Sequence, residues 1–286
     1  MRRLATACWV VVLLAGHAPG QAADPALPDI WAIKADLTLP PLSIRDPAAG
    51  HRVAQTTADW KGTGVHHLLY LPTDWKPNKR YPVLVEYGGN GAYRDQHGDT
   101  CDGTVEGCRL GFGLSGGKGY LWLCLPFVEI TPEGEKQNAV KWWGNVEETK
   151  RYCIATVGDV CERWGGDSSR VILCGFSRGS IACNYIGLND DTISKLWAGF
   201  FCHSHYDGVI EGWRYANADR ASALQRLQRL GDRPQLIVHE GSVHKTEAWL
   251  SSTGINGDWT FLSLPFRNHS DAWVLRDIPS RSAARD

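Results

Sequence analysis

The spacing of apolar residues along the chain predicts strands and helices that follow one another in alternation. Short apolar runs bounded by Gly, Pro, Asn or Asp are typical of strands, and they occupy residues 66–71, 81–87, 120–125, 171–174, 196–202, 234–239 and 259–264. Helical spacing occurs over residues 146–164, 181–188 and 221–230, and from residue 271 to the end. The run at 81–87 is apolar throughout, as a buried parallel strand would be.

Two segments lack a regular pattern. Residues 24–63 are rich in Pro, Ala and Asp, and we expect an arm that lies over the domain. Residues 92–119 are polar and Gly-rich, and loops of this length in a compact domain are usually functional. We therefore expect this second segment to roof part of a site. The main domain is expected to span residues 64–286.

The first 23 residues have the pattern of an export signal. Arg2 and Arg3 precede an apolar core over residues 5–14, and the small residues of 20–23 suit cleavage. The pattern predicts a secreted or periplasmic protein, with a retained anchor as the alternative.

Composition narrows the possible partners. The chain is 43% hydrophobic and 21% charged, which allows a sizeable core, and its net charge of −1 gives no field that attracts nucleic acid or an anionic membrane. Without Cys8 in the signal segment, eight of the nine cysteines remain. In an oxidising compartment we expect disulfides, with Cys101 and Cys108 as the most plausible pair because a Gly- and Asp-rich loop joins them.

The strongest chemical signal is the sequence GFSRG at residues 175–179. It follows the apolar run 171–174 and precedes a helical pattern, which predicts a strand, a sharp turn and a helix with Ser177 at the apex. Side chains two residues before and after such a serine would collide, so glycine is favoured there. The backbone N–H of Arg178 can then donate to a developing oxyanion. The alternative is a Gly-rich connection without chemistry.

At these residues the chain resembles the α/β-hydrolase family, and the resemblance extends from about residue 64 to the C-terminus. Its narrower likeness is to secreted esterases of the polyhydroxybutyrate-depolymerase and feruloyl-esterase type. The resemblance implies an α/β fold in a single domain, with a mostly parallel central sheet flanked by helices. It also implies a nucleophile, an acid and a base in that chain order.

The resemblance places the base at His269, which follows the last predicted strand. The acid is expected in the loop after the strand that ends at residue 239, where Glu240 is the nearest carboxylate. Asp207, after the preceding strand, is the alternative acid. A serine hydroxyl needs such a base, and the base needs an orienting partner.

Further site residues are expected around this group. In the resemblance, the loop after residue 87 is the first oxyanion loop, and we expect the amide of Gly89 or Asn90 to join that of Arg178; a simple turn is the alternative. Trp143 and Tyr87 are the candidate substrate contacts. Trp142 could take the place of Trp143, and core packing is the alternative for both tryptophans.

The run His203, His205 and Asp207 also permits a metal hypothesis, since alternate residues of an extended segment face one side. Such a site would need more ligands than the segment supplies. The sequence therefore favours a serine hydrolase that cleaves carboxylic esters of carbohydrate, feruloyl or polyester type and needs no metal or organic cofactor. The alternatives are a peptidase or amidase of the prolyl-oligopeptidase type and a secreted binding protein on a hydrolase scaffold.

Overall fold

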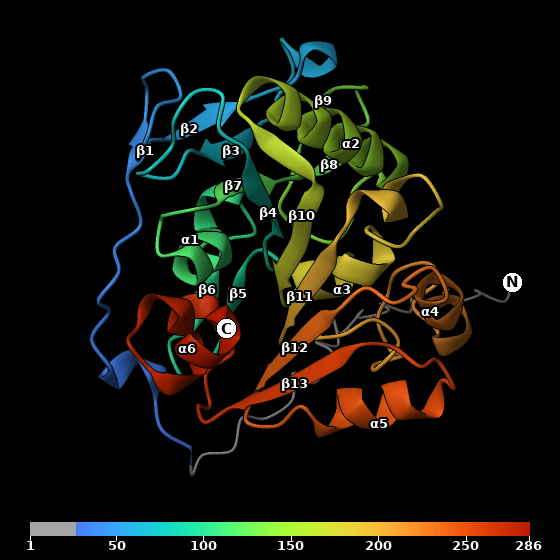
Figure 1. Cartoon of the computed structure of the whole chain (residues 1–286). Coiled ribbons are helices and arrows are strands. Elements are labelled where there is room, and N and C mark those ends of the chain that lie inside the picture. Colours follow the sequence, from blue (N-terminus) through green and yellow to red (C-terminus); the bar gives the residue numbers. More distant parts are fainter. Residues whose placement is uncertain (1–26) are drawn as a thin grey trace, which may run out of the picture.

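The computed structural model describes residues 27–286 (Figure 1). The predicted signal segment, residues 1–23, lies outside the described residues. The strands are β1 (Leu42–Ser43), β2 (Arg52–Gln55), β3 (His67–Tyr70), β4 (Tyr81–Tyr87), β5 (Tyr93–Arg94), β6 (Thr100–Cys101), β7 (Leu121–Leu125), β8 (Phe127–Ile130), β9 (Lys136–Ala139), β10 (Gly166–Phe176), β11 (Gly199–His203), β12 (Gln235–Glu240) and β13 (Trp259–Leu264). The helices are α1 (Leu110–Ser115), α2 (Val146–Arg163), α3 (Arg178–Tyr185), α4 (Arg220–Leu227), α5 (His244–Ser252) and α6 (Pro279–Arg285), with short 3-10 turns η1 (Ile30–Ala32), η2 (Ala58–Trp60), η3 (Val105–Gly107), η4 (Ile193–Leu196) and η5 (Asp271–Leu275).

Nine of these strands form one sheet in the order β1-β2-β3-β7-β4-β10-β11-β12-β13. Strands β7, β4 and β10 to β13 run parallel, and β3 is antiparallel to both of its neighbours. The predicted α/β class with a mostly parallel sheet is confirmed. Because the carboxyl ends of parallel strands meet at one edge, the segments after β4, β10, β11, β12 and β13 converge there.

Each face of the sheet packs against its own set of helices. Buried side chains of α2, α3, α4 and α5 join one apolar core, and those of α1 and η5 join the other. Figure 1 shows α1 and α6 together on their own side of the sheet, away from α2. Within residues 27–286, no helix is long and apolar enough to cross a membrane.

The pattern of the long apolar runs agrees closely with the observed elements. Strands β4 and β13 have the predicted bounds, and α2 ends one residue before the predicted end. The segment expected as an arm is in part a piece of the sheet, since β2 pairs with β3 over residues 52–55. The predicted last helix is divided into η5 and α6, because Pro279 cannot donate a backbone hydrogen bond and begins a new helix.

The expectation of no regular structure in residues 92–119 is wrong, since β5, β6, η3 and α1 lie there. Helix α1 contains Gly111 and Gly113, and glycine has the lowest helix propensity of all residues except proline. A Cβ at Gly111 would collide with Trp122, and one at Gly113 with Val274. Close packing therefore requires these glycines, and the local sequence pattern does not predict the helix.

Helix α1 is held at its N-terminus by a carboxyl group from β4. Glu86 is fully buried and accepts backbone N–H bonds from Arg109, Leu110 and Gly111 at 3.0, 3.1 and 2.9 Å. The indole Nε1 of Trp122 donates to the same group at 2.8 Å. These bonds satisfy the free N–H groups that every helix start presents, so the stability of α1 comes from a residue far away in sequence.

Replacing Glu86 by Gln is expected to lower the free energy of unfolding by about 3 kcal/mol. An amide nitrogen would then face buried N–H donors in place of an acceptor. Chemical denaturation followed by circular dichroism measures the change. The matched control is Glu133→Gln, at an exposed turn, for which a change within about 0.5 kcal/mol is expected. Equal stability of the two variants would contradict the role of Glu86.

The structure does not contain the expected bridge between Cys101 and Cys108, and all eight cysteines of residues 27–286 are free. The two sulfurs pack against different glycines of the loop after β4. A Cβ on Gly89 would lie 2.9 Å from the Cys101 sulfur, and one on Gly88 would lie 3.4 Å from the Cys108 sulfur. Both thiols thus serve as small packing groups beneath this loop.

Candidate active site

The nucleophile candidate lies at a strained turn between β10 and α3. Ser177 has φ +54° and ψ −112°, a conformation that residues with a side chain rarely adopt. Its backbone N–H is held by the carbonyl of His203 at 2.9 Å, and 8% of the residue is exposed. Strain of this kind in a residue with a side chain points to a functional position.

The glycines around Ser177 are required by close backbone contacts. A Cβ on Gly175 would collide with the carbonyl of Gly179, and a Cβ on Gly179 would collide with the carbonyl of Tyr87 at the end of β4. The helix after the serine therefore packs directly on the neighbouring strand. This contact fixes the first turn of α3 beside the loop that follows β4.

Three side chains from the ends of β10, β12 and β13 form a continuous hydrogen-bonded chain. Ser177 Oγ lies 3.0 Å from His269 Nε2, and His269 Nδ1 lies 2.6 Å from Glu240 Oε1. With its proton on Nδ1, the imidazole donates to the carboxylate and accepts from the serine hydroxyl. The arrangement can move a proton from the hydroxyl to the imidazole and stabilise the imidazolium that forms.

The two charged members of this chain change each other's pKa. Burial favours the neutral imidazole, but the Glu240 carboxylate outweighs it and raises the pKa of His269 above its ordinary value of 6.5. Burial likewise opposes the charged carboxylate, yet His269 holds the pKa of Glu240 well below its usual range. The carboxylate therefore stays ionised at neutral pH, and the imidazole needs a pH above 6.5 to act as a base.

The predicted oxyanion amides lie on two segments that the glycine contacts bring together. Within residues 27–286, the backbone N–H groups of Gly89, Asn90 and Arg178 donate to no protein acceptor. The side chain of Asn90 is occupied, because its Oδ1 accepts from the backbone N–H of Trp142 at 2.7 Å. Free N–H groups at a helix start and a glycine loop suit a developing negative charge.

The side chain of Arg178 has a structural role that the sequence analysis missed. It is 2% exposed and donates to the carbonyls of Trp142, Gly103 and Ala139 at 2.7, 3.3 and 3.4 Å. The guanidinium also lies over the ring of Phe127, 4.2 Å from its centre. Burial lowers the pKa of Arg178 to about 9, which leaves it charged at neutral pH. It joins the segments on either side of the site.

The prediction that Trp143 and Tyr87 contact the substrate is wrong, because both side chains belong to the core. They are 4% and 0% exposed. Trp143 stacks on Tyr185 with ring centres 4.5 Å apart, and Tyr87 stacks on Phe127 at 4.7 Å. Neither side chain can reach a substrate above Ser177.

Trp142, the neighbour of Trp143, instead lies at the site and is half-buried. Its φ is +49°, and its ring packs at the edge of the core cluster in which Trp143 is buried. The Trp142 ring contacts Trp213 at 5.4 Å, Trp213 contacts His205 at 5.5 Å, and His205 contacts His269 at 5.0 Å, measured between ring centres. We call Trp142, Trp213 and His205 the aromatic wall; it leads from the oxyanion loop to the candidate base.

The segment expected to roof the site also reaches the candidate base. The ring of Tyr93 meets that of His269 edge to face, with centres 5.0 Å apart. A cavity of about 330 Å³ lies between this segment and the loop after β4, and its lining includes Gly89, Cys101 and Arg109. The roofing segment and the aromatic wall thus both contact His269.

Asp207 is not the acid, because a buried ion pair occupies it. Arg226 donates to its two carboxylate oxygens at 2.8 and 3.1 Å, and the aspartate is 2% exposed. His203 is fully buried, and its Nε2 accepts from the Trp273 indole at 3.1 Å. The residues considered for a metal, His203, His205 and Asp207, therefore have separate partners and do not converge.

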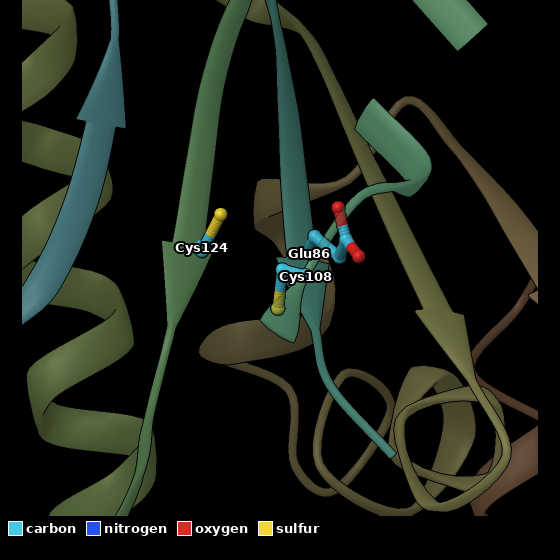
Figure 2. Close-up of side chains that lie close together, drawn as sticks. All are labelled: Glu86, Cys108 and Cys124. Atoms are coloured by element: carbon cyan, nitrogen blue, oxygen red, sulfur yellow. The ribbon is translucent and has the colours of Figure 1, made fainter. Parts of the chain in front are cut away.

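Among residues 27–286, one group has the spacing of metal ligands: Glu86 of β4, Cys124 of β7 and Cys108 before α1 (Figure 2). Their ligand atoms lie within 4.8 Å of one another, and all three residues are buried. Each carboxyl oxygen of Glu86 already accepts two hydrogen bonds from the start of α1 and from Trp122. No acceptor position is left for a cation, so the group is structural.

The solved structures with a similar fold include esterases and a dipeptidyl aminopeptidase. The feruloyl esterase module of Clostridium thermocellum, solved with sinapinate, is 13% identical; the match covers 88% of this chain and 93% of the module, with a TM-score of 0.55. A fungal esterase of Rhizomucor miehei is 11% identical over 84% of this chain and 82% of its own, with a TM-score of 0.52. A Bacteroides ovatus protein described as a dipeptidyl aminopeptidase IV is 16% identical over 78% of this chain, with a TM-score of 0.51.

The chain spans only part of some proteins that it resembles: 34% of the dipeptidyl aminopeptidase and 60% of a thermostable esterase. No family model matches the chain. No curated protein matches it in sequence. The likeness at these identities is one of fold, and together with the sheet order and the position of Ser177 it shows that this chain has the α/β-hydrolase fold.

Proposed function

We propose that the protein is a serine hydrolase that cleaves carboxylic esters through an acyl-enzyme on Ser177. The observation that carries the proposal is the chain of hydrogen bonds from Ser177 through His269 to Glu240, with the serine on a strained turn. The esterases among the structural neighbours support an ester substrate. Export, predicted by residues 1–23, is part of the proposal.

The mechanism follows from the positions of these groups. His269 accepts the proton of Ser177 as the serine oxygen bonds to the ester carbon, and the amides of Arg178 and of the Gly89 and Asn90 loop stabilise the oxyanion. The carbon–oxygen bond to the alcohol then breaks, and the alcohol leaves with the proton from His269. Water, activated by the same imidazole, hydrolyses the acyl-enzyme and releases the acid.

A panel of substrates tests the reaction class. The protein should hydrolyse acetyl, feruloyl or polyester substrates, and addition of a chelator should leave the rate unchanged. Turnover of peptide nitroanilides with no turnover of esters would instead establish a peptidase. Absence of turnover on every ester and peptide, with the protein folded, would favour a binding protein and overturn the proposal.

The aromatic wall supports an ester with a ring that presents an apolar face, either an aromatic acid or a sugar. Aromatic side chains offer an apolar face on which such rings stack. The wall lies beside the candidate base, since His205 contacts both Trp213 and His269. The neighbour solved with sinapinate is named a feruloyl esterase, which favours the aromatic acid.

Replacing Trp213 by Ala is expected to raise KM for a feruloyl ester about tenfold, through lost stacking and lost apolar contact. KM for an acetyl ester should change less than about twofold, because the acetyl group has no ring to stack on the Trp213 indole. Steady-state kinetics on both esters measure the split. The matched control is Trp164→Ala, a half-buried tryptophan that precedes β10 at the opposite sheet edge. Equal effects on both esters would contradict recognition by the wall.

A further inference from the structure

Ser204, directly after β11, has an unusual backbone conformation that no turn motif in the sequence predicts. Its φ is +87°, a region that glycine occupies freely and that strains a residue with a Cβ. Its backbone N–H is held by the carbonyl of Val238 at 2.8 Å, so the position is fixed against the next strand. A glycine would fit this backbone better, so the reason for a serine must lie in its side chain.

The hydroxyl of Ser204 touches the hydrogen-bonded chain at its acid end. Ser204 Oγ donates to Glu240 Oε1 at 2.9 Å and lies 2.9 Å from His269 Nδ1. The residue is 2% exposed, so its hydroxyl faces these groups rather than water. It does not reach Ser177 through any hydrogen bond among residues 27–286, and any effect on the nucleophile must pass through Glu240 and His269.

Glu240 has few other hydrogen-bond restraints, since the His239 imidazole lies 3.7 Å from its Oε2, beyond hydrogen-bond distance. Its Oε1 accepts from both His269 and Ser204, whereas its Oε2 is buried and has no hydrogen-bond partner among residues 27–286. Ser204 is therefore the neutral donor that holds this carboxylate. Without it, one bond to His269 would remain, and a carboxylate held by one bond can rotate about its terminal torsion, which is broad and soft.

We propose that Ser204 is a positioning residue for the acid: its hydroxyl keeps Oε1 of Glu240 directed at His269 Nδ1, and the strained backbone is the cost of placing the hydroxyl there. The inference rests on the proposed function, because the orientation of Glu240 matters only if His269 acts as a base. It makes the end of β11 part of the machinery, although that strand supplies neither nucleophile, acid nor base.

The test uses Ser204→Gly and Ser204→Ala, with kcat and KM for a p-nitrophenyl ester and with thermal unfolding. Both variants remove the hydroxyl, and only glycine also relieves the backbone. We expect kcat to fall on the order of tenfold in both, as for loss of a hydrogen bond to a charged group, with KM within about twofold of the parent. The glycine variant should melt at or above the parental temperature.

The matched control is Asn78→Gly, which relieves another positive φ, +64°, in the turn before β4. It should match or exceed the parental melting temperature and keep the parental kcat. A merely structural Ser204 would make the glycine variant stable and fully active. Parental kcat in Ser204→Gly, or a change in KM alone, would thus overturn the inference. Failure of the parent to hydrolyse any ester would overturn the proposed function instead, so the two failures are distinguishable.

Discussion

Replacing Ser177 by Ala is expected to lower kcat for a p-nitrophenyl ester by at least about 10⁴-fold, the effect of removing the nucleophile from such a chain. His269 and Glu240 would remain, but they would have no hydroxyl to activate. The measurement is steady-state kinetics on purified protein, with circular dichroism to show that the variant is folded. The small methyl group fits the same backbone, so the melting temperature should change little.

The matched control for this variant is Ser168→Ala, an exposed serine near the other end of β10. It should keep the parental rate within about twofold. If Ser177→Ala hydrolysed the ester at the parental rate, the acyl-enzyme mechanism would be excluded, whatever other residue carried the activity.

Replacing Glu240 by Gln is expected to lower kcat about 10³-fold and to change the pH dependence. The amide can present its N–H₂ to Nδ1 and favour the tautomer that leaves Nε2 protonated, which cannot accept the serine proton. In the parent, Glu240 raises the pKa of His269 above 6.5, so the acidic limb of kcat/KM should lie above pH 6.5. Without the carboxylate, burial dominates and lowers the pKa of His269, and the limb should move to lower pH.

The pH profile of kcat/KM from pH 4 to 9, in the parent and in Glu240→Gln, measures this shift. Asp207→Asn is the companion variant, since Asp207 was the alternative acid. Its loss leaves Arg226 without its buried partner, so we expect lower stability with the limb in its parental place. A limb that moved in Asp207→Asn and stayed in Glu240→Gln would reverse the assignment of the acid.

The sequence predicted the parts of this site that follow from local pattern. GFSRG lies between an apolar run and a helical pattern, so Ser177 could be placed at a turn from its neighbours alone. The resemblance to the α/β-hydrolase family placed the expected base at His269, after the last strand, and β13 has the predicted bounds. Glu240 and Asp207 could not be separated, since the difference is the pairing of Asp207 with Arg226, which lies on another element.

What the sequence could not predict depends on contacts between distant segments. Trp142 and Trp143 differ in burial, because Trp143 packs inside the core and Trp142 lies half-buried at its edge, and the neighbouring residues do not predict this difference. Helix α1 depends on Glu86, which lies 23 to 25 residues earlier than the amides that it accepts. The residues beside Ser204 form no recognisable motif, because its contacts with Glu240 and His269 form only where β11, β12 and the segment after β13 meet.

The most direct test of the account is a fluorophosphonate probe, followed by peptide mapping of the modified residue. Such a probe bonds covalently to a serine activated by a neighbouring base. The account predicts one label, on Ser177, which is lost in Ser177→Ala and forms much more slowly in Glu240→Gln. A folded parent protein that takes up no label, or takes it up at another residue, would contradict it.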